Sequence, residues 1–317
     1  MRFSYSYYFT RSTLVVCIST LLVSCSTRGP VSDETEHHPA TAPKIVTTEG
    51  LKFPLDEYQA SEKEQETSDR AQAALTKQCM KRLGFEYAPP EKTAASMDRR
   101  HAGVFGILDM EIAARYGYGR KVETSLQGAG TSLQSEAERV ALAGAKDLAL
   151  EDLPMSQEEA DKRGGSEQKI NGRRVPVGGC TRESFLKLYA RTPDSVDLLY
   201  VFNLQRDAES AALNDSRIKN VNKLWSACMK KHGFVANDPM KAATQLGFDD
   251  EETASSPRAI TIAKKDVECK QNINLAGIYF NVESIYQTRI IDANIKMLDL
   301  AKRQLKDRLK LAESLTP

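Results

Sequence analysis

The sequence has few of the residues, and none of the short motifs, on which most enzymes depend. It holds four histidines and one tryptophan in 317 residues. His37 and His38 lie in a polar N-terminal stretch, which leaves only His101 and His232 for a folded site. No G-x-S-x-G, H-E-x-x-H, G-x-x-x-x-G-K-[ST] or G-x-G-x-x-G pattern occurs. A hydrolytic triad needs a positioned histidine, so we predict no catalytic residue and no cofactor.

The chain also lacks an excess of charge of either sign. It has 44 Lys and Arg residues against 43 Asp and Glu residues. Such a balance gives no electrostatic attraction to nucleic acid, so we predict no nucleic-acid partner. The acidic run at 249–252 is typical of a solvated surface. A hydrolase that works through two carboxylates stays open as an alternative.

No apolar run is long enough to cross a bilayer. The longest is Thr13–Ser24, twelve residues, whereas a spanning helix needs about 20. Arg2 and Arg11 precede this run and give it a positive flank. This combination predicts a cleaved signal peptide over residues 1–24.

The end of the apolar run, Leu22-Val23-Ser24-Cys25, resembles the lipobox of bacterial lipoproteins. The resemblance implies that Cys25 carries the lipid and becomes the mature N-terminus; ordinary secretion with an incidental cysteine is the alternative. We therefore expect the membrane as a partner through an N-terminal lipid anchor. The expected location is the cell membrane, facing the extracytoplasmic side. Residues 25–50 are polar and rich in Ser, Thr and Pro, which predicts a flexible tether.

Four cysteines remain once Cys17 in the signal peptide and the lipidated Cys25 are set aside. They lie at positions 79, 180, 228 and 269. Four cysteines outside the cell predict two disulfides with three possible connectivities. A metal site is the alternative, but the chain has no C-x-x-C or H-x-x-x-H spacing, so we predict no metal.

Two of these cysteines begin a repeated heptapeptide. Residues 79–85 read CMKRLGF and residues 228–234 read CMKKHGF, with five identical positions. Lysine is favoured in the last turn of a helix, and glycine is favoured at the left-handed position after it. The phenylalanine that follows can pack back against the helix as the hydrophobic contact of a Schellman motif. Each copy is followed by one further cysteine. The simplest pairing joins Cys79 to Cys180 and Cys228 to Cys269, while crossed pairings stay open.

Hydrophobic periodicity predicts a mainly α-helical, disulfide-stapled domain over 51–317, with a small β-hairpin and a long C-terminal helix. Asn171-Gly172 is a favoured two-residue hairpin turn. The domain would comprise two related units, about 56–190 and 194–317. The expected helices are 56–83 (capped by Asp56), 108–116, 135–148, 181–189, 194–213, a helix after Asp215 that ends near Lys231, a helix from about 259 through Cys269, and 275–314.

The last of these helices is longer than the rest of the domain can easily cover. Its distal part is therefore expected to be exposed, and to pair either with the polar first helix or with another protein. An envelope protein that docks on helix 275–314 is a possible partner.

The motifs together resemble a group of uncharacterised secreted lipoproteins of actinobacteria. They are the lipobox, Leu51–Tyr58, Cys79–Phe85, Gly178–Cys180, Trp225–Phe234 and Asp266–Cys269. The resemblance implies a mostly helical extracytoplasmic domain and brings no established activity. We expect a surface-anchored lipoprotein with a binding or accessory role in the bacterial cell envelope. The alternatives are a carboxylate-dependent envelope hydrolase and a transporter-associated lipoprotein that docks through its C-terminal helix.

Overall fold

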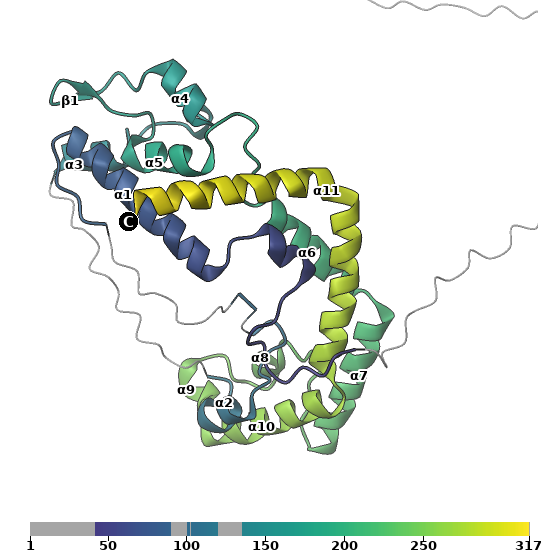
Figure 1. Cartoon of the computed structure of the whole chain (residues 1–317). Helices are drawn as coiled ribbons and strands as arrows, with labels where there is room; N and C mark the ends of the chain where they lie inside the picture. The colour runs from purple at the N-terminus through teal and green to yellow at the C-terminus, as the bar shows by residue number, and fades with distance from the viewer. Residues whose placement is uncertain (1–41, 90–99, 102, 120–134, 317) are drawn as a thin grey trace, which may run out of the picture. The chain divides into compact units, whose positions relative to one another are not determined.

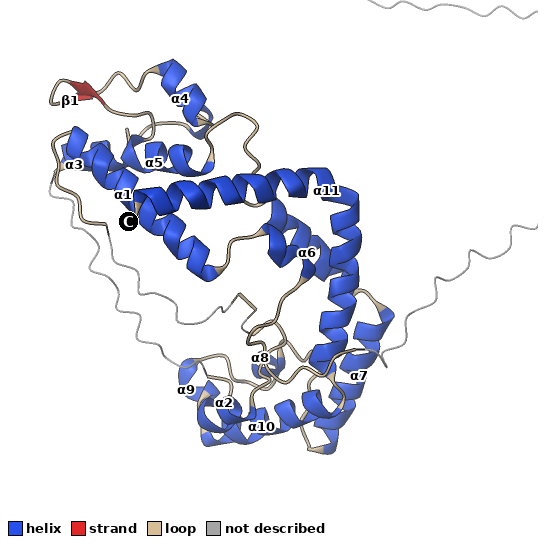
Figure 2. Ribbon diagram, in the orientation of Figure 1, coloured by secondary structure: helices blue, strands red, loops and turns tan. Residues whose placement is uncertain are grey.

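The computed structural model describes residues 42–89, 100–101, 103–119 and 135–316. Cys25 and the expected signal peptide lie outside them. The described chain is mainly helical, with one short hairpin, which confirms the predicted fold class (Figure 1; Figure 2). In chain order the elements are η2 (Pro54–Tyr58), α1 (Glu62–Arg82), α2 (Met110–Tyr116), α3 (Glu136–Ala143), η3 (Leu150–Asp152), α4 (Gln157–Arg163), β1 (Lys169–Ile170), β2 (Arg173–Arg174), α5 (Gly179–Tyr189), α6 (Tyr200–Leu213), α7 (Ser216–Lys231), α8 (Ala242–Gln245), α9 (Glu251–Ala254), α10 (Pro257–Asn272) and α11 (Leu275–Leu315).

The predicted hairpin is confirmed, and it closes the end of a helix. β1 and β2 pair antiparallel around Asn171-Gly172, where both residues have positive φ. The Asn171 amide donates to the Leu83 carbonyl at 2.7 Å, just past the last turn of α1. Arg173 donates to the Arg82 carbonyl at 2.9 Å. The hairpin thus satisfies two carbonyls that the helix itself leaves without partners.

The first predicted helix is broken into two. The chain turns through η2 and starts again at Ser61, whose side chain and that of Glu64 form a reciprocal capping box. Asp56 does not cap the long helix; its carboxylate accepts the Phe53 N–H at 2.8 Å and closes η2 instead. A capping box satisfies two donors at once, so Ser61 is the stronger start signal.

Two other helices are shorter than predicted. α3 ends at Ala143, because Gly144 takes a φ of 85°, and a Cβ at this position would lie only 2.8 Å from the Gly178 Cα. α6 begins at Tyr200 and not at 194. The stretch before it is tied to α11, since Val196 donates its N–H to the Gln304 side chain at 2.8 Å.

The long C-terminal helix is confirmed as α11, and it joins three separate hydrophobic clusters. Figure 1 shows that it bends along its length. Its first turns pack in the large core with α7 and α10, its middle packs Leu298 against Val201 of α6, and its end packs Ala312 against Ala71 of α1 and Leu188 of α5. The expected pairing of the distal part with the first helix is therefore confirmed, and α5 packs there as well. The predicted exposure is wrong for the face that these two helices cover. The two predicted units share this helix.

The predicted tether is too long at its C-terminal end. The Asn274 side chain donates to the Pro43 carbonyl at 3.1 Å, and Ile45 packs against the large core. Residues 42–50 therefore belong to the helical body. Residues 25–41 lie outside the described part of the chain.

The large core surrounds a buried charged network. Trp225 donates its indole N–H to Asp266 at 2.8 Å, and Lys270 forms an ion pair with the same carboxylate at 3.1 Å. Burial raises the pKa of Asp266 and lowers that of Lys270.

No described helix is both long and apolar enough to cross a membrane.

Candidate functional site

The four cysteines in the described chain form two disulfides, and their pairing is the one predicted. Cys79 joins Cys180, linking α1 to α5 with a Cα–Cα distance of 5.5 Å. Cys228 joins Cys269, linking α7 to α10 at 5.7 Å. Both repeat copies end their helices in the same way, with the phenylalanine N–H bonded to the methionine carbonyl and the glycine N–H to the lysine carbonyl. The repeated motif thus has a structural role.

One histidine lies beside the second disulfide. The possible ligand atoms of Cys228, His232 and Cys269 all lie within 4.8 Å of one another. Both sulfurs are consumed in the disulfide, so neither is a thiolate able to hold a metal. No other cluster of this kind occurs among the residues described.

The other histidine takes part in a buried hydrogen-bonded network. His101 Nε2 lies 2.8 Å from Asp56 Oδ2, and its ring packs edge-on against Phe53 at 4.9 Å. The Asp56 carboxylate also closes η2, as described above. Because this carboxylate already accepts a backbone N–H in η2, the contact between His101 and Asp56 stabilises the fold.

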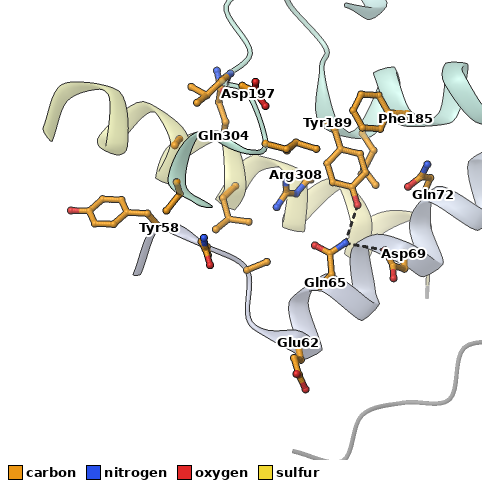
Figure 3. Close-up of a pocket in the computed structure, with 18 of the residues that line it drawn as sticks. Tyr58, Glu62, Gln65, Asp69, Gln72, Phe185, Tyr189, Asp197, Gln304 and Arg308 are labelled. Carbon is orange, nitrogen blue, oxygen red and sulfur yellow. Dashed lines mark hydrogen bonds between the residues drawn. The ribbon is translucent and has the colours of Figure 1, made fainter. Parts of the chain in front are cut away.

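The most promising site is a cleft with a volume of about 530 Å³. Its walls come from η2, the first turns of α1, the end of α5, residues 196–198, Val201 of α6 and the last turns of α11. These segments are far apart in sequence, and α11 brings them together. Pockets of 300–1,000 Å³ are typical of small-molecule sites. Figure 3 shows the side chains that line it.

One wall of the cleft is formed by Phe185, Tyr189 and Arg308, which belong to a stack of rings and cations. The Arg182 guanidinium lies 5.3 Å from the centre of the Phe185 ring, and Phe185 stacks on Tyr189 at 5.2 Å. Arg308 of α11 lies over the same Tyr189 ring at 4.8 Å. The Gln65 amide donates to the Tyr189 hydroxyl at 3.3 Å, as drawn in Figure 3. Tyr189 is therefore held both through its ring and through its hydroxyl.

Arg308 is a charged group without a counterion in the described chain. No described carboxylate lies within ion-pair distance of it, and its buried Nε makes no hydrogen bond to a described residue. Burial lowers the pKa of its guanidinium, although Tyr189 and Glu64 act in the opposite sense. An arginine stays charged in proteins, so this wall presents a positive charge to the cleft.

Three carboxylates line the same cleft, but they do not converge. Figure 3 shows Glu62, Asp69 and Asp197 at separate edges, with Arg308 between them. Asp69 accepts from the Gln65 amide at 2.9 Å, and Asp197 accepts the Leu199 N–H at 2.8 Å. A two-carboxylate hydrolase needs its acids about 5–9.5 Å apart on either side of one bond. The arrangement gives no support to such a pair.

A second hollow, of about 640 Å³, shares Gln59, Arg100 and Leu305 with the first in its lining. Lys52, Lys302 and Lys306 line it. Lys302 already pairs with Glu57 at 3.0 Å, and Lys52 and Lys306 are exposed to solvent. Hydrated lysines gain little from a new partner, so the cleft at Arg308 is the better candidate.

Sequence reasoning did not find this cleft. Arg308 lies on the stripe of α11 that includes Leu305 and Ala312, three residues after one and four before the other. That stripe was interpreted as apolar. A cation that interrupts an apolar stripe is a signal that could have drawn attention to this position.

Comparisons with known proteins add no identity to this geometry. The sequence matches no known protein family, no curated protein and no solved structure.

Proposed function

We propose that the protein is a lipid-anchored binding protein of the bacterial cell envelope, and that the cleft at Arg308 is its ligand site. The cleft is the observation that carries the proposal. It has the volume of a small-molecule site, a wall pre-organised by stacked side chains, and a guanidinium that lacks a counterion among the described residues. The location rests on the lipobox at Cys25, and the likeness to secreted lipoproteins rests on sequence motifs alone.

Binding fits this cleft better than catalysis does. Its three carboxylates are separated, and neither described histidine lines it. General acid–base chemistry needs a group within hydrogen-bond reach of the reacting atom and a partner that tunes it. A polar cleft with fixed walls needs neither to bind a ligand.

An envelope protein that docks on α11 is less well supported. Ile295 and Met297 are the only exposed large hydrophobic residues of α11 in the described chain. Residues two apart on a helix point to different faces, so they do not form one apolar stripe. The remaining large apolar side chains of this helix are buried or half-buried.

Ligand binding can be tested without knowing the ligand. We expect a pool of small molecules extracted from the envelope and the growth medium to raise the melting temperature of the full chain. Gln72→Trp places a bulky ring in the cleft and should abolish the shift. Gln78→Trp is the matched control, because this residue is exposed on the same helix and does not line the cleft. An unchanged melting temperature of the wild type in every pool would contradict a binding function.

The anchor is tested separately, by replacing single cysteines. Cys25→Ser should prevent lipidation and release the protein from the membrane fraction. Cys17→Ser lies inside the expected signal peptide and should leave the protein on the membrane. Incorporation of labelled palmitate, followed by fractionation, reads out both variants. Equal labelling of the two would show that Cys25 is not the lipidated residue.

A further inference from the structure

The ligand class can be inferred from the charges of the cleft, on the assumption that the proposed binding function is correct. The inner wall carries Arg308, whose Nε is shielded from solvent and makes no hydrogen bond to any residue described. A buried donor left without a partner costs about 1–3 kcal/mol. Arg308 also lines the cleft and forms no ion pair with a described residue, so a ligand that brings an acceptor to the outer N–H groups of its guanidinium compensates this charge. The site therefore favours an anion at this position.

The shape of the guanidinium narrows the choice of anion. Its N–H groups form a planar fork that matches the two oxygens of a carboxylate or of a phosphate. Tyr189 holds the plane from one side, and Gln65 fixes Tyr189. The guanidinium is therefore held in position before the ligand arrives, which reduces the conformational entropy lost on binding.

The outer edges of the cleft carry the opposite charge. Glu62, Asp69 and Asp197 contribute three carboxylates, against Arg100 and Arg308 as the lining cations. A doubly charged phosphate at Arg308 would face this net negative rim. A ligand with one carboxylate and one cationic group would satisfy both ends. Leu198, which is exposed, and Leu305, which is half-buried, also line the cleft and offer apolar surface.

We propose that the cleft binds a small zwitterion, either a free amino acid or a short peptide. Its α-carboxylate pairs with Arg308, its ammonium group faces the acidic rim, and its side chains contact Leu198 and Leu305. The free amino acid and the peptide share this chemistry and differ only in length.

The test is isothermal titration of the full chain with five probes. L-leucine and L-alanyl-L-leucine carry both charges, N-acetyl-L-leucine lacks the ammonium group, L-leucinamide lacks the carboxylate, and the fifth is inorganic phosphate. At least one of the two zwitterions should bind, and which one binds tells the amino acid from the peptide. Loss of the carboxylate should weaken binding by about tenfold to a hundredfold, as expected for a charge-assisted hydrogen bond. Loss of the ammonium group should weaken it by a smaller factor, because the rim is more solvated.

Variants of α11 assign the effect to Arg308. Arg308→Gln should weaken binding of the zwitterion by about tenfold to a hundredfold. The affinity of Arg308→Lys should lie between those of the wild type and Arg308→Gln, because lysine keeps the charge and lacks the planar fork of N–H groups. Arg303→Gln is the matched control, since Arg303 is exposed on the same helix and does not line the cleft. Circular dichroism checks that each variant folds.

Three results would overturn the ligand class. Phosphate could bind as tightly as the zwitterions, which would make the cleft a general anion site. N-acetyl-L-leucine could bind as tightly as L-leucine, which would remove the role of the rim. The third result is that none of the five probes binds. The first two would leave the proposed binding function intact, and the third would leave it intact only if the small-molecule pool still raised the melting temperature.

Discussion

Each of the two disulfides involves the cysteine of one copy of the seven-residue repeat, but the two bonds lie in hydrophobic clusters of different size. The Cys228–Cys269 bond adjoins one cluster of nineteen buried residues, which includes Trp225. The Cys79–Cys180 bond lies in a cluster of six, and α1 meets the end of α11 through a separate cluster of three. Dense packing resists local opening, whereas small, separate clusters leave gaps between elements. The cleft lies in the second kind of region.

The buried cations of the two regions differ in the same way. Lys270 is fully buried in the large core and satisfied by Asp266 and the Ile107 carbonyl. Arg308 is only partly buried and has no carboxylate partner among the described residues. A satisfied buried charge holds a fold together, whereas an unsatisfied one at the edge of a cleft is available to a ligand.

The largest predicted effect is the loss of stability on removing Lys270, for which removal of Arg308 is the comparison. Lys270→Met leaves Asp266 buried without its counterion, which should cost about 3–5 kcal/mol of unfolding free energy. Arg308→Met leaves no buried carboxylate behind, so its effect should stay within about 1 kcal/mol of zero. Urea unfolding of the two variants at pH 7 measures both values.

A surface pair on the same helix serves as the control for the lysine variant. Lys265 pairs with Glu268 at 2.6 Å, and both side chains are about 40% exposed. Lys265→Met should therefore change the unfolding free energy by less than about 1 kcal/mol. The double variant Lys270→Met with Asp266→Asn should recover part of the loss, because no charge stays buried. Equal losses for Lys270→Met and Arg308→Met would break the comparison between the two regions.

A smaller effect, a dependence of stability on pH, is expected from Glu283 of α11. Burial raises the pKa of Glu283 to about 7. The Gln287 hydrogen bond and His101 lower it, while Glu209 and Asp56 raise it. The folded pKa lies above the ordinary value of 4.5, so the folded chain holds this proton more tightly than the unfolded chain does. Stability should therefore fall as pH rises from about 4.5 to 7, by at most about 3 kcal/mol.

Glu283→Gln tests this prediction by removing the titration. The variant should lose that part of the pH dependence and exceed the wild type in stability at pH 8, with little difference at pH 4.5. Glu313→Gln, an exposed position on the same helix, should follow the wild type at every pH. Parallel urea titrations from pH 4.5 to 8 give the curves. Identical slopes for Glu283→Gln and the wild type would refute the assignment.

Features set by neighbouring residues could be predicted from the sequence. The Asn171-Gly172 turn, the Ser135 and Asp215 caps and both glycine helix ends follow from chemistry within a few residues. The repeat also favoured the disulfide pairing that the structure shows, although it left crossed pairings open. The break before Ser61 was missed because two start signals competed within a few residues, and the capping box was the stronger.

Features set by distant segments could not be predicted. The cleft needs Gln65, Tyr189 and Arg308 to meet, and they lie more than a hundred residues apart in sequence. No periodicity says which face of α11 will meet α1. The first helix was one of two expected partners for the end of α11, but the sequence does not say which side chains their contact encloses.

The smallest predicted effect separates the two copies of the repeat. Gly84 and Gly233 have φ angles of 92° and 86°, where alanine costs about 1–2 kcal/mol. A Cβ at Gly84 would also lie 2.5 Å from the Asn171 amide nitrogen, whereas nothing lies within 4 Å of a Cβ at Gly233. Gly84→Ala should therefore cost about 1–2 kcal/mol more than Gly233→Ala, because Asn171 must give up its bond to the Leu83 carbonyl. Urea unfolding of the two variants measures this difference.

Removing Asn171 shows whether the hairpin is the source of the difference. In an Asn171→Ala background the short contact is gone, so Gly84→Ala should cost no more than Gly233→Ala does in the wild type. Asn171→Ala alone should cost about 1–3 kcal/mol, since the Leu83 carbonyl loses one bond and alanine tolerates the φ of 51° less well than asparagine does. If Gly84→Ala keeps its extra cost in that background, the hairpin is not what distinguishes the two helix ends. The cause would then lie in the packing of Phe85 against the neighbouring six-residue cluster.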